Sequence, residues 1–102
     1  MEAYFFDAIR TPRGKGNAKG ALVGCTATHL ATGLLHALRT RHDLDPTAVE
    51  ELILGCVTQL NDQGANLAKT IAQQSGYGDH LPAFTLNRFC GSGLEAINQA
   101  AA

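Results

Sequence analysis

The sequence predicts an α/β fold in which short strands alternate with crossover helices in the order β-α-β-α-β-α. Residues 51–59, "ELILGCVTQ", are apolar on consecutive positions, as buried strands of a parallel sheet are. Segments with apolar residues at helical spacing separate the short strand-like runs. Because strand–helix–strand connections are right-handed, this order predicts a parallel-type sheet with helices on both faces.

The first elements are an aromatic strand, a glycine-rich loop and a long helix. Residues 3–8, "AYFFDA", have the composition of a strand. Residues 10–24, "RTPRGKGNAKGALVG", are basic and rich in glycine, which predicts a flexible surface loop. A helix is then expected over residues 28–41, with Thr26 or Thr28 as its N-cap. Its apolar residues recur every four positions, at Leu30, Leu34 and Leu38.

The second half of the chain repeats this alternation. Asp45 and Pro46 suit the N-cap and first position of a short helical turn before the strand at 51–59. A second helix is expected over residues 65–75, ended by Gly76 as a C-cap. The third strand, "PAFTLN" at 82–87, leads through "RFCGSG" into a third helix that reaches residue 102.

Composition excludes several classes of protein. The chain has 102 residues, a net charge of −1 and 45% hydrophobic residues, so no charge excess favours nucleic acid or an anionic membrane. No apolar run approaches the roughly 20 residues that cross a bilayer, and no signal peptide is evident, so a cytoplasmic location is expected. The cysteines and histidines are not at metal-ligand spacing, and surface or packing roles are expected for His29, His36, His42 and His80.

Cys90 is the candidate catalytic residue because it lies where a strand turns into a helix. The first N–H groups of a helix lack partners and carry partial positive charge, which favours a thiolate nucleophile and can stabilise an oxyanion. The small residues 91–93 allow close approach of an acyl group, although Ser92 can instead act as an N-cap. A second interpretation stays open, in which Cys90 is a small buried residue. Structural roles are expected for Cys25 and Cys56.

The loops match no nucleotide-binding motif. Gly14, Gly16 and Gly20 form neither G-x-G-x-x-G nor a P-loop, so a phosphate cradle is the minor alternative to a surface loop. The polar segment 61–66, "NDQGAN", is sufficiently explained as a loop. Support of the nearby site or of a subunit contact by its amides is the alternative.

The stretch 87–94, "NRFCGSGL", resembles the active-cysteine signature of the thiolases, N-x-x-C-G-S-G. The "RTP" element at 10–12 and "GCVTQ…DQGANLAK" at 55–69 are similar to two further thiolase segments in the same order. The resemblance covers essentially all of the chain. Two positions depart from the family pattern, since Lys69 replaces the usual arginine and Leu67 a frequent proline. The stretch "QGANLA" is closer to degradative than to biosynthetic thiolases.

The resemblance implies an acyl-CoA acyltransferase of layered α-β-α-β-α fold. Cys90 would carry the acyl group as a thioester, with its own backbone amide as an oxyanion donor. CoA and acyl-CoA would be substrates, and no cofactor or metal is implied. A homodimer or homotetramer is expected, with residues 82–87 at the contact, and no nucleic-acid or membrane partner.

The family's catalytic histidine, in a G-H-P motif, and its second cysteine, near C-x-G-G, have no counterpart in this sequence. Residues 1–102 are therefore interpreted as the N-terminal portion of a thiolase N-terminal domain, inactive by itself. Two alternatives stay open. One is a thiolase-like fragment that acts only in subunit association, and the other is a superfamily relative such as a ketoacyl synthase.

Overall fold

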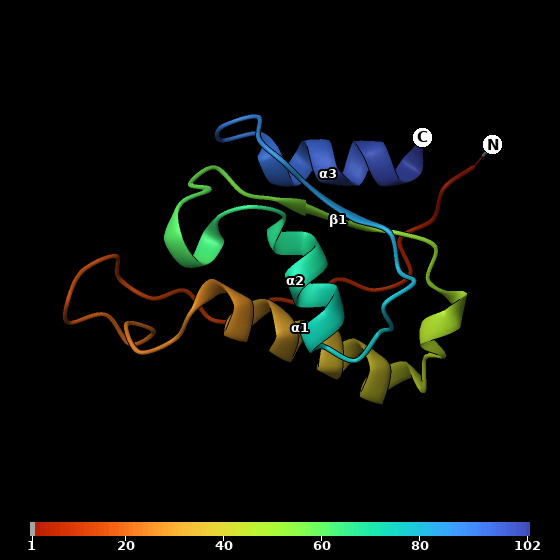
Figure 1. Cartoon of the computed structure of the whole chain (residues 1–102), viewed down its shortest axis with the longest axis horizontal. Helices are drawn as coiled ribbons and strands as arrows, with labels where there is room; N and C mark the ends of the chain where they lie inside the picture. Colours follow the sequence, from red (N-terminus) through yellow and green to blue (C-terminus); the bar gives the residue numbers. More distant parts are fainter. Residues whose placement is uncertain (1) are drawn as a thin grey trace.

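A two-stranded parallel sheet with helices on both faces organises the chain. The computed structural model describes residues 2–102. In chain order the elements are α1 (Ala27–His42), η1 (Pro46–Ala48), β1 (Leu52–Gly55), η2 (Asn61–Gln63), α2 (Leu67–Gln74), β2 (Ala83–Leu86) and α3 (Ser92–Ala101) (Figure 1). β1 and β2 pair in parallel from Leu52↔Ala83 to Gly55↔Leu86. The predicted α/β class is confirmed.

The helices form layers around this sheet. α3 packs on β1 on one side, α2 contacts both strands on the other, and α1 packs against α2 farther out (Figure 1). The centre of the core is Ala72, Tyr77 and Leu81, which are all buried. α2 turns an apolar face inward, formed by Leu67, Ala68, Ile71 and Ala72. This face forms because its residues recur at the three- and four-residue spacing of a helix.

Local capping signals explain where α1 begins and ends. Thr26 Oγ1 accepts a hydrogen bond from the backbone N–H of His29 at 3.0 Å, so Thr26 is the N-cap. The helix ends at Asp43, whose φ of 48° lies in the left-handed region and breaks the helical repeat. Arg39, Arg41 and His42 occupy the last turn, where positive charge complements the helix dipole.

α2 is tied to the chain that returns to β2. Gly76 follows the helix with a φ of 75°, a conformation that glycine adopts without steric cost. Lys69 Nζ donates to the carbonyl oxygens of Asp79 and Leu81, each at 2.7 Å. These charge-assisted bonds fix the turn between α2 and β2. Lysine thus has a defined structural role at this position.

The predicted first strand is wrong. Residues 3–8 form no strand in the described structure, and the side chains of Tyr4, Phe5 and Phe6 are 82%, 80% and 87% exposed. The segment pairs with neither β1 nor β2, so its backbone gains no ladder hydrogen bonds and its aromatic rings stay outside the core. Its main anchor is Asp7, which contacts the last turn of α1.

Two element boundaries also differ from the prediction. β1 has only four residues, because the N–H of Cys56 makes the last ladder bond, to Leu86 O at 2.9 Å, before the chain turns towards η2. α3 begins at Ser92 rather than at residue 94. No helix among residues 2–102 is both long and apolar enough to cross a membrane.

Candidate active site at the start of α3

A tight turn joins β2 to α3 and contains Cys90. Phe89 has a φ of 49°, a left-handed conformation that is uncommon for a residue with a side chain. Asn87 Oδ1 accepts the N–H of Phe89 at 2.8 Å, and the N–H of Gly91 donates to Arg88 O at 3.0 Å. The turn reverses the chain abruptly enough to place Cys90 directly before the helix.

Ser92 connects the two sides of this turn. It is only 5% exposed, and its Oγ accepts the N–H of Arg88 at 2.8 Å. The same hydroxyl donates to Phe89 O at 2.7 Å, and the Ser92 N–H reaches that oxygen at 3.1 Å. The expected N-cap role is wrong, because Ser92 is the first residue of α3 and Gly91 occupies the cap position without a side-chain bond.

Cys90 is an exposed, free cysteine. The interpretation of Cys90 as a small buried residue is therefore wrong. Within residues 2–102, the backbone N–H groups of Cys90, Gly93 and Leu94 donate to no protein acceptor. Cys90 thus lies in the turn before α3, next to backbone amides without a protein partner at the positive end of the helix dipole. Free amides in this position can donate to an oxyanion.

Arg88, two residues before Cys90, contacts Glu95 in the first turn of α3. Its Nε lies 4.0 Å from Glu95 Oε2, and its side chain is 70% exposed. The pair is at the edge of ion-pair distance, so its strength is modest. Arg88 is better described as a partner of the first turn of α3.

The other two cysteines have different surroundings. Cys56 is half-buried after β1, with its Sγ 3.5 Å from Thr58 O and 3.6 Å from Gln63 Oε1. Cys25 is half-buried and lines a hollow of about 350 Å³ formed by the basic loop, together with Gly14, Lys15, Gly16, Asn17, Leu22 and Val23. Neither has the helix-start position of Cys90, which agrees with the structural roles expected for both.

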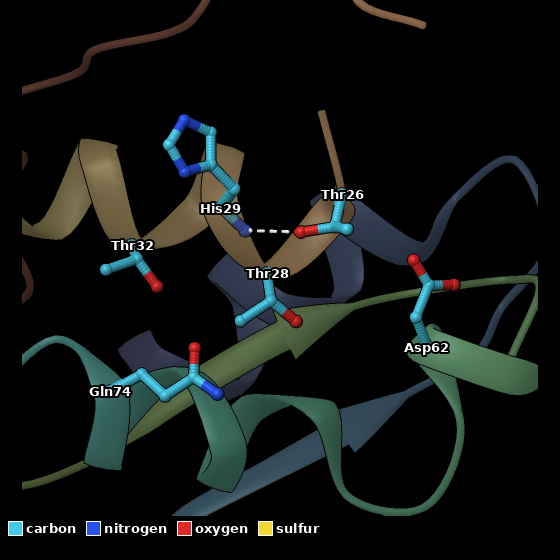
Figure 2. Close-up of a pocket in the computed structure, with 6 residues that line it drawn as sticks. All are labelled: Thr26, Thr28, His29, Thr32, Asp62 and Gln74. Carbon is cyan, nitrogen blue, oxygen red and sulfur yellow. Dashed lines mark hydrogen bonds between the residues drawn. The ribbon is translucent and has the colours of Figure 1, made fainter. Parts of the chain in front are cut away.

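A second hollow lies away from Cys90, between the start of α1, η2 and α2. Its volume is about 290 Å³. The residues that line it all have polar side chains, and Figure 2 draws them as sticks: Thr26, Thr28, His29, Thr32, Asp62 and Gln74. The N-cap bond from the His29 N–H to Thr26 Oγ1 joins two of these residues (Figure 2). The described residues contain no group of three His, Cys, Asp or Glu side chains placed to hold a metal ion.

The sequence places Cys90 at a strand-to-helix turn, as the structure does, but sequence reasoning missed how two residues shape this turn. Gly55, at the end of β1, faces the first turn of α3, where an added Cβ would lie 2.7 Å from the carbonyl carbon of Ser92. The only sequence signal is a glycine inside an apolar strand, which indicates close backbone approach. Ser92 was expected to be a small residue or an N-cap, and not a residue whose hydroxyl bonds back to Arg88 and Phe89.

The fold and the site define an α/β protein that presents an exposed cysteine in the tight turn between a parallel strand and a helix. The family described as "Thiolase, N-terminal domain" matches residues 4–102. The chain therefore belongs to the thiolase family, as the resemblance of its motifs predicted.

Individual relatives agree with this assignment. The chain is 43% identical to a 3-ketoacyl-CoA thiolase of Shewanella loihica over 101 residues, which are 98% of this chain and 26% of the relative. A steroid 3-ketoacyl-CoA thiolase of Mycobacterium tuberculosis is 39% identical over 95% of this chain and 23% of its own length. The crystal structure of the Bacillus anthracis acetyl-CoA acetyltransferase superposes with a TM-score of 0.72 at 39% identity, covering 80% of this chain and 21% of that one. The chain thus spans about a quarter of its relatives' length.

Proposed function

We propose that the protein to which this chain belongs is an acyl-CoA acyltransferase of the thiolase type, with Cys90 as nucleophile. The observation that carries the proposal is the exposed Cys90 in the turn before α3, where its own N–H and those of Gly93 and Leu94 donate to no protein acceptor within residues 2–102. Thiolase relatives that match nearly the whole chain support the reaction class. CoA and its acyl thioesters are the proposed substrates.

The proposed chemistry begins with attack of the Cys90 thiolate on a carbonyl carbon of the substrate. A C–S bond forms, and the carbonyl electron pair moves to oxygen, which becomes an oxyanion. Backbone N–H groups at the helix start donate to that oxyanion. When the intermediate collapses, the leaving group is CoA thiolate from acetyl-CoA, or the enolate of acetyl-CoA from a 3-ketoacyl-CoA. Either route leaves an acyl thioester on Cys90.

Protonation of the leaving group needs an acid, and deprotonation of the second substrate needs a base. The four histidines of this chain lie outside a G-H-P motif, and Cys25 and Cys56 lie outside a C-x-G-G motif. We therefore propose that residues 1–102 supply the nucleophile and that turnover needs further residues. The chain alone is predicted to be inactive in turnover.

A homo-oligomer is part of the proposal. Within the described residues, β2 pairs with β1 along one edge only, so its second edge is available to another strand. Residues 82–87 are accordingly the proposed contact with a second copy. Sedimentation of the protein expressed from its complete gene tests this assignment. A monomer at micromolar concentration would contradict it.

Intact-mass spectrometry tests the nucleophile. The protein from the complete gene is mixed briefly with acetyl-CoA or acetoacetyl-CoA, quenched in acid, and weighed. The expected result is a gain of one acetyl group, located on the peptide that contains Cys90. The gain disappears in Cys90→Ser and persists in the matched controls Cys25→Ser and Cys56→Ser. An unlabelled wild-type protein, or label that survives Cys90→Ser, would overturn the proposal.

A further inference from the structure

We propose that Ser92 is a positioning residue that aims the backbone N–H of Cys90 at the substrate oxygen. This inference rests on the proposed function, because it assigns the oxyanion donor of the same site. The evidence is a pair of hydrogen bonds made by the hydroxyl of the buried Ser92. This hydroxyl accepts from the N–H of Arg88 and donates to the carbonyl of Phe89.

The geometry of one peptide group carries the argument. The carbonyl of Phe89 and the N–H of Cys90 belong to the same planar, trans peptide unit, so they point in opposite directions. Ser92 holds the carbonyl inward with its hydroxyl at 2.7 Å and its own N–H at 3.1 Å. The N–H of Cys90 must therefore point outward, and within residues 2–102 it meets no protein acceptor.

The turn needs this restraint because its backbone is strained. Phe89 has a φ of 49°, a left-handed conformation that persists only where the surroundings enforce it. Rotation of the Phe89–Cys90 peptide, about ψ of Phe89 and φ of Cys90, would turn the Cys90 N–H away from the substrate. The Ser92 hydroxyl opposes this rotation through its two bonds. One holds the N–H of Arg88, before Phe89, and the other holds the carbonyl of Phe89 itself.

Packing fixes Ser92 itself. The residue is 5% exposed, and its backbone lies so close to Gly55 that a Cβ there would be 2.7 Å from the Ser92 carbonyl oxygen. The hydroxyl is thus held by β1 and α3 together rather than by the mobile end of a loop. A preorganised donor of this kind acts without reorganisation when charge develops on the substrate oxygen.

The test separates oxyanion stabilisation from reactivity of the thiol. Acyl transfer from p-nitrophenyl acetate to Cys90 passes through a tetrahedral oxyanion, whereas alkylation by iodoacetamide does not. Both rates are measured on the protein from its complete gene, for the wild type, Ser92→Ala, Ser92→Thr and Ser75→Ala. Ser75 is a matched control, since it is 1% exposed and its hydroxyl donates to the carbonyl of Ala72, three residues earlier, at 3.1 Å.

The ratio of acylation to alkylation is the deciding quantity. In Ser92→Ala we expect this ratio to fall by up to about a hundredfold, the lower end of the loss seen when an oxyanion donor is removed outright, because the Cys90 N–H remains but is no longer held in place. Ser75→Ala and Ser92→Thr are expected to stay within about twofold of the wild type, because neither loses the hydroxyl at position 92.

An unchanged ratio in Ser92→Ala overturns the assignment, as does a parallel fall of both rates. Should Ser92→Ala not fold, a fall of the ratio in folded Ser92→Thr overturns it equally. Because p-nitrophenyl acetate contains no CoA, the result is independent of whether CoA thioesters acylate the protein. Failure of the proposed function is seen separately, in the intact-mass experiment.

Discussion

Gly55 at the end of β1 and Ser92 at the start of α3 lie in direct backbone contact. A Cβ on Gly55 would lie 2.7 Å from both the carbonyl carbon and the carbonyl oxygen of Ser92, and 2.9 Å from the nitrogen of Gly93. Real Cβ atoms do not approach backbone this closely, and the backbone of a helix start cannot rotate away as a side chain can. The absence of a side chain at position 55 therefore lets α3 pack on β1 beside Cys90.

Substitution Gly55→Ala is expected to push the first turn of α3 away from the sheet. Overpacking of this kind costs about 1–3 kcal/mol of unfolding free energy, measured by urea denaturation. Gly33→Ala is the control, since position 33 is inside α1 and an added Cβ there has nothing within 4 Å. That variant should gain up to about 1 kcal/mol, because alanine is the better helix former. Equal stability of Gly55→Ala and the wild type would contradict the contact.

Asn66 joins α2 to β2 with both ends of its side-chain amide. Its Oδ1 accepts the N–H of Lys69 and the hydroxyl of Thr85, each at 3.2 Å, and its Nδ2 donates to Ala83 O at 2.8 Å. Asn66→Ala should lose about 2 kcal/mol of unfolding free energy, since the helix cap and the link to the strand disappear together.

Asn66→Asp separates the two roles of this side chain. Aspartate retains the cap acceptor, but it loses the Nδ2 donor and places negative charge beside the carbonyl of Ala83. Its stability in urea is expected to lie between those of the wild type and Asn66→Ala. If Asn66→Asp were as stable as the wild type, the bond to Ala83 would contribute nothing measurable.

Local signals explain which elements the sequence predicts correctly. Thr26 caps α1 and Gly76 follows α2 with a positive φ, and both features depend on residues within a few positions. A strand depends on a neighbouring strand far away in the sequence. The aromatic composition of residues 3–8 predicted a strand. In the described structure this segment has no neighbouring strand with which to pair.

The candidate site was predictable in position but not in detail. The sequence placed Cys90 at a strand–helix turn, because an apolar run ends and small residues follow. It gave no sign that Phe89 is left-handed, since nothing in the residue type favours that conformation. Without that turn, the bonds from Ser92 back to Arg88 and Phe89 cannot be anticipated, and a helix cap is the natural expectation.

Tyr77 is expected to make stability decrease at high pH. Its side chain is 3% exposed, and its hydroxyl donates to Leu35 O at 2.6 Å. Burial raises the pKa of Tyr77, and the guanidinium of Arg39, 5.6 Å from the ring centre, offsets part of this rise. The pKa of Tyr77 in the folded state exceeds the unfolded value of about 10. The stabilisation by the protonated Tyr77 hydroxyl is therefore complete below pH 10 and is lost as the pH rises through the raised pKa.

Urea denaturation from pH 7 to 11 measures this effect. Tyr77→Phe should lose about 1 kcal/mol at pH 7, from the missing hydrogen bond, and should lack the alkaline loss that Tyr77 causes. Tyr4→Phe is the matched control, because Tyr4 is exposed and its removal should leave stability at pH 7 within about 0.5 kcal/mol of the wild type. A wild-type alkaline profile in Tyr77→Phe would show that another group titrates.

Asp7 anchors the N-terminal segment to the last turn of α1. Its Oδ2 lies 2.6 Å from His42 Nε2 and 3.1 Å from Arg41 Nη1, and its Oδ1 accepts the N–H of Ala8 at 2.7 Å. The hydrogen bond with His42, then that with Ala8, and the charge and hydrogen bond of Arg41 lower the pKa of Asp7. The edge of the Phe6 ring meets the same imidazole, with the ring centres 5.5 Å apart.

The sign of the pH effect follows from this lowered pKa. The carboxylate contributes to anchoring above the ordinary aspartate pKa of about 3.9, and the contribution is lost as the pH falls through the lower folded pKa. Limited proteolysis by pepsin is measured from pH 5 down to pH 2 and scaled to the rate of pepsin on a denatured substrate. Cleavage near Phe5 and Phe6 should increase as the pH decreases through the lowered pKa of Asp7. Asp7→Asn should be cleaved readily throughout. Asp43→Asn, which removes a nearby carboxylate outside this cluster, should follow the wild type, and equal protection of Asp7→Asn would show that the anchor lies elsewhere.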